Sequence, residues 1–201
     1  MDDYTYILAH GFGFNNDYWQ NLISYLPGKW RFFEPGMSLA GDRKYIGIGH
    51  SLGFLKLNNS GLWFDYLVGL QPFLNFCGTD RRLHEFRKQQ LDKVISDFKL
   101  DAEQFLKNFR CQCGYLGAVA LDNPEQLAAE FSLMQLSYPH NGVKTLVLAG
   151  KDDQVVPYSL VIDNFLGIAQ VTIDELSGTK HVLGYKKPEA VALKISEFIN
   201  G

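Results

Sequence analysis

Cysteine is scarce in this sequence, and its scarcity excludes two classes of protein. The 201 residues contain only Cys77, Cys111 and Cys113, and this low, odd number argues against a scaffold held by disulfides. One residue separates Cys111 from Cys113 and no histidine follows at ligand spacing, so the pair does not predict a zinc site. We therefore expect reduced thiols, no bound metal and no cofactor.

Long apolar runs and a strong charge of either sign are also lacking. No run approaches the roughly 18 apolar residues that a membrane-spanning helix needs. The start, Met1-Asp2-Asp3, is acidic, whereas a signal peptide begins with basic residues, so we expect a cytoplasmic protein. The formal net charge of −3 does not indicate nucleic-acid binding. We expect neither a membrane nor a nucleic acid as partner, and we favour a monomer.

What the sequence does contain is an alternation of strand-like and helical patterns. Strands are predicted at residues 4–9, 30–33, 45–49, 64–70, 145–149 and 170–173. Helices are predicted at residues 17–26, 52–59 and 188–199. This alternation indicates an α/β fold with a mainly parallel sheet that helices cover on both faces.

Between residues 72 and 139 the pattern becomes helical throughout. Apolar residues recur at helical spacing over residues 83–98, Asp101 is a predicted N-cap for a second helix, and a third helix is predicted at 124–136. The segment is too short for an independent domain. We expect one domain over residues 1–201, with residues 72–139 forming a small helical lid inserted between two core strands.

The motif Gly49-His50-Ser51-Leu52-Gly53 lies where a predicted strand gives way to a predicted helix. Such a turn exposes the serine hydroxyl, and small residues two positions before and after it avoid a clash. The N–H of Leu52 then lies at the helix N-terminus, where it can stabilise an oxyanion. Gly-x-Ser-x-Gly alone arises by chance about 0.1 times in a chain of this composition, so its place at a strand end matters more. We predict that Ser51 is a catalytic nucleophile.

A serine hydroxyl is a weak nucleophile at neutral pH and needs a histidine base that a carboxylate orients. Enzymes with this turn supply the three groups in the order Ser, Asp or Glu, His. Asp152 and Asp153 follow the predicted strand at 145–149, and His181 is the only histidine after them. Each alone could be an ordinary turn former or loop residue, but the complete set in this order predicts a triad.

A second oxyanion donor should come from the loop after the first strand. His10-Gly11-Phe12-Gly13 lies there, and its glycines let the backbone approach a substrate oxygen. We predict that the Phe12 N–H is this donor and acts together with the Leu52 N–H.

These motifs together resemble the α/β-hydrolase superfamily. The resemblance runs through almost the whole chain, over the segments HGFG, EPG, GHSLG, LVLAGKDDQVVP and GTKH. It implies an α/β-hydrolase fold. It also implies that the acid of the triad is Asp153, in Gly150-x-x-Asp153-x-x-Val156-Pro157, rather than Asp152.

Within the superfamily, the chain is most similar to the pimeloyl-acyl-carrier-protein methyl ester esterases of biotin synthesis. The similarity lies in the HGFG start, in LVGLQPFLNF at residues 67–76, and in a helical insertion with basic and phenylalanine residues. It implies a serine carboxylesterase for an acyl methyl ester, with Arg81, Arg82 and Arg87 binding the substrate or its acidic carrier protein. Eight Lys/Arg against five acids give residues 81–110 a charge of +3, which suits such a carrier or an ordinary solvated face.

The triad is compatible with more than one activity. The same triad serves thioesterases, lactonases, peptidases and C–C hydrolases, because the lid decides the acyl and leaving groups. A binding module without catalysis is a further alternative, against which the complete triad argues.

One departure from the family concerns residues 34–44, which alone separate the strand at 30–33 from the strand at 45–49. A parallel crossover normally takes a dozen or more residues. We therefore expect the intervening helix of typical members to be missing or reduced to one turn.

Overall fold

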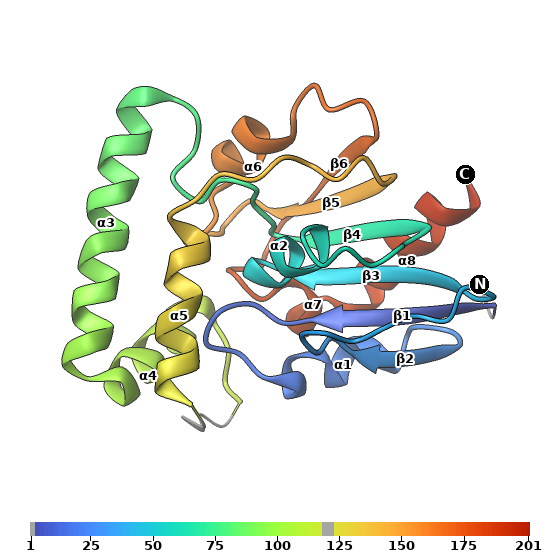
Figure 1. Cartoon of the computed structure of the whole chain (residues 1–201), viewed down its shortest axis with the longest axis horizontal. Coiled ribbons are helices and arrows are strands. Elements are labelled where there is room, and N and C mark those ends of the chain that lie inside the picture. The colour runs from blue at the N-terminus through green and yellow to red at the C-terminus, as the bar shows by residue number, and fades with distance from the viewer. Residues whose placement is uncertain (1–2, 118–122) are drawn as a thin grey trace.

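A computed structural model describes residues 3–117 and 123–201 and contains one six-stranded sheet (Figure 1). The strands are β1 (Tyr4–Ala9), β2 (Lys29–Phe32), β3 (Lys44–His50), β4 (Tyr66–Leu70), β5 (Thr145–Gly150) and β6 (Val171–Leu176). Their order across the sheet is β2-β1-β3-β4-β5-β6, and every neighbouring pair is parallel. The predicted mainly parallel α/β sheet is confirmed.

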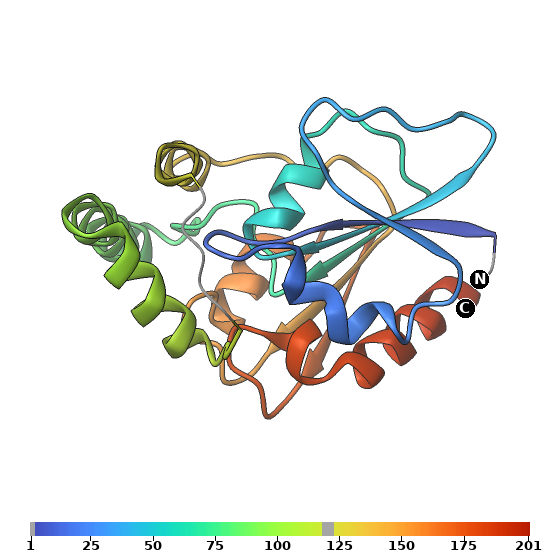
Figure 2. The same ribbon diagram turned by 90° about the horizontal axis from the view of Figure 1, so that it is seen from below.

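Helices cover both faces of the sheet, which explains the continuous apolar runs of its central strands (Figure 2). One face packs against α2 (Leu52–Asn58) and α6 (Tyr158–Phe165). The other packs against α1 (Gln20–Ile23), α7 (Leu183–Lys186) and α8 (Pro188–Asn200). Alternate residues of a strand serve the two layers: Ile7 belongs to the first and Leu8 to the second.

Three further helices lie between β4 and β5 in the chain, beyond the carboxyl ends of the strands (Figure 1). They are α3 (Arg81–Leu100), α4 (Ala102–Cys113) and α5 (Pro124–Met134), and we call them the inserted helices. The Asp101 side chain accepts a hydrogen bond from the Gln104 N–H and caps α4, as its sequence position predicts. Asn123 caps α5 in the same way through the Gln126 N–H.

The prediction of a helix over residues 17–26 is wrong in form. The segment is a 3₁₀ turn, η1 (Asn16–Trp19), followed by the four-residue α1. Tyr18 and Trp19 are both fully buried, and a tight turn places these consecutive side chains in the core, which one face of a regular helix does not. Helices α6 and α7 were not predicted from the sequence, and neither begins with a side-chain cap.

The crossover between β2 and β3 contains no helix. Residues 33–43 instead form an extended loop with turns, one of them at Gly36, whose φ is +79°. The expected loss of the intervening helix is therefore confirmed, and the side of α2 that faces this loop is left less covered.

None of the helices within residues 3–117 and 123–201 is long and apolar enough to cross a membrane.

Candidate active site

Ser51 occupies the sharp turn between β3 and α2. Its φ of +52° and ψ of −122° lie in a region that residues with a side chain rarely adopt. The Ser51 N–H donates to the Leu70 carbonyl of β4 at 2.9 Å, and its own carbonyl accepts from the Phe54 N–H at 3.0 Å. The turn is thus held from both sides, and it presents the hydroxyl at the carboxyl edge of the sheet.

The two glycines of the motif are required by close backbone contacts. A Cβ on Gly49 would lie 2.3 Å from the Phe54 Cα, and a Cβ on Gly53 would lie 1.9 Å from the Ala9 carbonyl oxygen. Any side chain at either position would therefore push α2 away from β1 or β3. The motif is a packing requirement of this turn as much as a sign of chemistry.

Asp153 and His181 meet at the same edge of the sheet, in the loops after β5 and β6. Their side chains are buried, with whole-residue exposures of 3% and 1%, and His181 Nδ1 donates to Asp153 Oδ2 at 2.7 Å. The other carboxylate oxygen accepts from the N–H groups of Val155 at 2.8 Å and Val156 at 3.0 Å. A carboxylate bound in this way fixes the ring so that Nε2 is left as the proton acceptor.

Asp152, the alternative acid, points elsewhere. It is exposed, and its Oδ2 accepts a hydrogen bond from the Gly178 N–H at 2.9 Å. Of the two neighbouring acids, only Asp153 contacts His181.

Two buried polar residues that the sequence analysis did not assign hold the His181 loop. His50 Nε2 donates to the His181 carbonyl at 2.8 Å, and the two rings lie 4.8 Å apart between centroids. Gln71 Nε2 donates to the Lys180 carbonyl, while its Oε1 accepts from the Leu183 N–H at 3.2 Å. A detectable signal for Gln71 was its position, since it is a polar residue directly after the apolar strand β4.

His50 stays neutral in this position. Its ring stacks on Tyr18 at 4.3 Å, and complete burial together with the neighbouring His181 holds the pKa of His50 well below its ordinary value. His50 therefore acts as a neutral hydrogen-bond donor to the loop that carries His181.

The loop after β1 lies directly against the serine. A Cβ on Gly11 would come within 3.0 Å of the Ser51 Cβ. Among the described residues, neither the Phe12 N–H nor the Leu52 N–H donates to a protein acceptor, so both are available to a ligand. Arg110 of α4, which is buried, donates to the Gly13 carbonyl and secures this loop.

Ser51 lines a cavity of about 520 Å³ between the sheet edge and the inserted helices. The lining is mostly apolar and includes Phe12, Phe73, Leu91, Phe105, Phe131 and Met134. In the part of the chain that the structure describes, the Ser51 hydroxyl has no hydrogen-bond partner, as suits a group that faces an open cavity. We call this the serine cavity.

The three arginines predicted to bind the substrate or its carrier lie in two different surroundings. Arg81 and Arg82 are exposed in the first turn of α3 and do not line the serine cavity. Arg87, one and a half turns further along, lines it.

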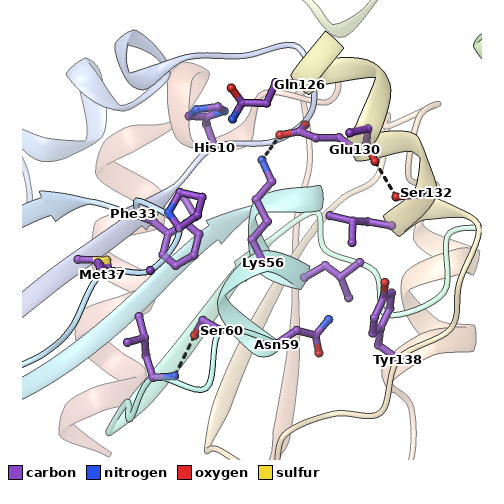
Figure 3. A pocket seen from close by; sticks show the side chains of 17 residues that line it. His10, Phe33, Met37, Lys56, Asn59, Ser60, Gln126, Glu130, Ser132 and Tyr138 are labelled. Atoms are coloured by element: carbon purple, nitrogen blue, oxygen red, sulfur yellow. Dashed lines mark hydrogen bonds and ion pairs between the residues drawn. The ribbon is translucent and has the colours of Figure 1, made fainter. Parts of the chain in front are cut away.

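A second cavity of about 610 Å³ lies where the β2–β3 crossover lacks a helix (Figure 3). Lys56 reaches from α2 to Glu130 of α5 and forms an ion pair of 2.5 Å, with both side chains less than one-fifth exposed. Burial lowers the pKa of His10, at the rim of this cavity, to about 4. Ser51 does not line it, so we separate this cavity from the candidate active site.

Metal-ligating side chains do not gather in either place. Within residues 3–117 and 123–201, no three His, Cys, Asp or Glu side chains are positioned to hold a metal ion.

Comparison with solved structures gives matches over nearly the whole chain. An esterase from Exiguobacterium antarcticum has a TM-score of 0.69 and 15% identity, covering 98% of this chain and 92% of that one. MenH from S. aureus has a TM-score of 0.67 and 14% identity, covering 100% and 94%. A bromoperoxidase from Bacillus anthracis has a TM-score of 0.70 and 13% identity, covering 98% and 92%.

The chain has the α/β-hydrolase fold. No protein-family model and no curated protein matches the sequence. At these identities the similarity establishes architecture, and the chemistry must be inferred from the site itself. Ser51, Asp153 and His181 follow strands β3, β5 and β6 of this α/β-hydrolase fold, in the order that its enzymes use.

The close packing of the turn at Ser51 predicts that one added methyl group at Gly53 destabilises the fold strongly. Gly53→Ala should lower the free energy of unfolding by about 3 kcal/mol, because the new Cβ meets the Ala9 backbone. Urea unfolding followed by circular dichroism measures the change. Gly41→Ala is the matched control, since nothing lies within 4 Å of a Cβ there; equal stability of the two variants would contradict the packing requirement.

The ion pair of the second cavity predicts a smaller effect on stability. Lys56→Met should cost about 2 kcal/mol, because Glu130 loses its partner in a largely buried place, although partial exposure reduces the effect. The control is Lys93→Met, which breaks the exposed pair with Asp97 and should cost less than about 0.5 kcal/mol. The double variant Lys56→Met, Glu130→Leu should recover most of the loss. A single variant as stable as the wild type would show that the pair contributes nothing.

Proposed function

We propose that this protein is a carboxylic ester hydrolase in which Ser51 is the nucleophile, His181 the general base and Asp153 the orienting acid. The observation that carries the proposal is the buried 2.7 Å hydrogen bond between His181 and Asp153, next to the strained turn of Ser51. The apolar serine cavity supports an acyl chain as the bound part of the substrate.

In the acylation step, Ser51 Oγ attacks the ester carbonyl carbon while its proton passes to His181 Nε2. The carbonyl oxygen becomes an oxyanion that accepts hydrogen bonds from the Phe12 and Leu52 N–H groups. Asp153 stabilises the imidazolium that forms on His181. The carbon–oxygen bond then breaks, and His181 gives its proton to the departing alcohol.

In the second step, water attacks the acyl-enzyme. His181 accepts a proton from the water, the second oxyanion uses the same two N–H groups, and the acid leaves as the proton returns to Ser51. These steps use only groups of this chain and water, so the reaction needs no cofactor.

Ser51→Ala should abolish hydrolysis of short p-nitrophenyl esters, with a loss of at least about 10⁴-fold in kcat, and should keep the fold. Asp153→Asn should cost about 10³-fold or more, because the base loses its correct tautomer, whereas Asp152→Asn should have little effect. Ser132→Ala, in the second cavity, is the control for loss of an unrelated serine hydroxyl. Turnover by Ser51→Ala at the wild-type rate would overturn the assignment.

The finer part of the proposal concerns the substrate. We propose an acyl methyl ester carried on acyl carrier protein, with the pimeloyl ester of biotin synthesis as the candidate, and action as a monomer in the cytoplasm. The exposed Arg81 and Arg82 at the start of α3 support it, because a basic surface attracts an acidic carrier. Arg110, which belongs to the same basic stretch of sequence, is buried and adds nothing to this surface.

Charge reversal tests the carrier. Arg81→Glu with Arg82→Glu should lower kcat/KM about 10-fold on the carrier-bound ester and leave small esters unchanged, because only the carrier meets these side chains. The matched control is Lys29→Glu with Arg43→Glu, an equal change of charge at the amino ends of the strands. Equal effects of the two double variants on the carrier-bound ester would contradict a carrier site on α3.

A further inference from the structure

Arg87 is placed on the face of α3 that forms one wall of the serine cavity. Residues of α3 that line this cavity recur at spacings of three and four, which places them on one face of the helix. They include Leu83, Arg87, Gln90, Leu91 and Val94. Ser51 lines the same cavity from the edge of the sheet. An ester bound at Ser51 can therefore extend along the apolar lining toward a guanidinium group.

No group among the described residues neutralises Arg87 by direct contact. Within residues 3–117 and 123–201, its guanidinium forms no hydrogen bond or ion pair, and no carboxylate lines the cavity. The acid that acts on it electrostatically is Asp163, whose Oδ2 already accepts the Thr79 N–H at 2.6 Å. Arg87 is thus the only Lys or Arg among the described lining residues, and it stands in mostly apolar surroundings.

This placement is costly for a cation unless an anion joins it. Partial burial lowers the pKa of Arg87 from its ordinary value, against the opposing effect of Asp163, because desolvation disfavours the charged form. A guanidinium remains charged at neutral pH even so, and it binds carboxylate and phosphate oxygens in pairs. Neither a neutral acyl chain nor a neutral alcohol would neutralise its positive charge.

We propose that Arg87 binds an anionic oxygen group, a carboxylate or a phosphate, that the ester substrate carries at the end remote from the scissile bond. The serine cavity then selects esters that combine an apolar chain with a distal negative charge. The inference rests on the proposed function and adds a substrate class to it. Arg87 in this role is distinct from Arg81 and Arg82, which are exposed outside the cavity.

Three p-nitrophenyl esters with chains of equal length separate the sources of the charge. One is the neutral octanoate, the second is the half-ester of suberate, which ends in a carboxylate, and the third is an octanoate that ends in a phosphate. The wild type should hydrolyse at least one anionic ester with a higher kcat/KM than the neutral ester. The anionic ester whose kcat/KM exceeds that of the neutral ester by the larger factor identifies the oxygen group that Arg87 binds.

Arg87→Gln should lower kcat/KM for the preferred anionic ester about 10- to 100-fold, mainly through KM, and change that for the neutral octanoate less than about 3-fold. Arg87→Lys should retain part of the preference, since the charge remains without the paired hydrogen bonds. Lys88→Gln, which removes an exposed cation on the same helix but outside the cavity, should leave all three values unchanged.

The outcomes separate this inference from the proposed function. Hydrolysis of the neutral octanoate by wild type and Arg87→Gln shows that the triad works and that the variant folds. With that activity present, an equal loss on all three esters, or no loss on the anionic ones, overturns the anionic subsite and leaves the esterase in place. Absence of any Ser51-dependent hydrolysis by the wild type overturns the esterase itself.

Discussion

The site depends on the backbone of Ser51, which is held in a conformation that costs a residue with a side chain about 1–3 kcal/mol. Packing helps to sustain it, because α2 approaches β1 so closely that Gly53 has no room for a Cβ beside the Ala9 carbonyl. The hydrogen bond from the Ser51 N–H to Leu70 ties the same turn to β4. One strained residue thus joins three strands and a helix, and its hydroxyl cannot move without moving them.

A parallel sheet brings the remaining groups to the same edge as that hydroxyl. Loops after β5 and β6 leave the sheet at the edge where β3 ends, so Asp153 and His181 need only short segments to meet at that edge. The loop that carries His181 is held by His50 on one side and Gln71 on the other. Because burial keeps His50 neutral, it positions His181 without opposing the positive charge that the proposed mechanism places there.

Local sequence patterns predicted the parts of the molecule that depend on interactions between residues close in the sequence. The buried strands β1, β3 and β5, the cap at Asp101 and the turn at Ser51 all follow from short-range periodicity or chain geometry. The roles of His50 and Gln71 did not, since their partners lie more than 100 residues away in the sequence. The helix over 17–26 failed because core burial of Tyr18 and Trp19 prevailed over helical periodicity.

Arg87 shows the same limit at the site. Sequence placed Arg81, Arg82 and Arg87 in one basic group, whereas helix geometry turns only Arg87 into the cavity.

Phe12 belongs both to the candidate oxyanion site and to the apolar wall of the serine cavity. Its N–H is a candidate oxyanion donor, and its ring packs against Phe131 of α5 at 4.6 Å and against Phe98 of α3 at 6.0 Å. A neighbouring face of α5 is tied to α2 by the Lys56–Glu130 pair. An acyl chain that fills the serine cavity would therefore contact the helices α3 and α5. These helices position the Phe12 ring, and the Phe12 N–H is the candidate oxyanion donor. In the proposed mechanism, substrate fit and stabilisation of the transition state are thus coupled through Phe12, and the inserted helices influence the rate as well as the choice of substrate.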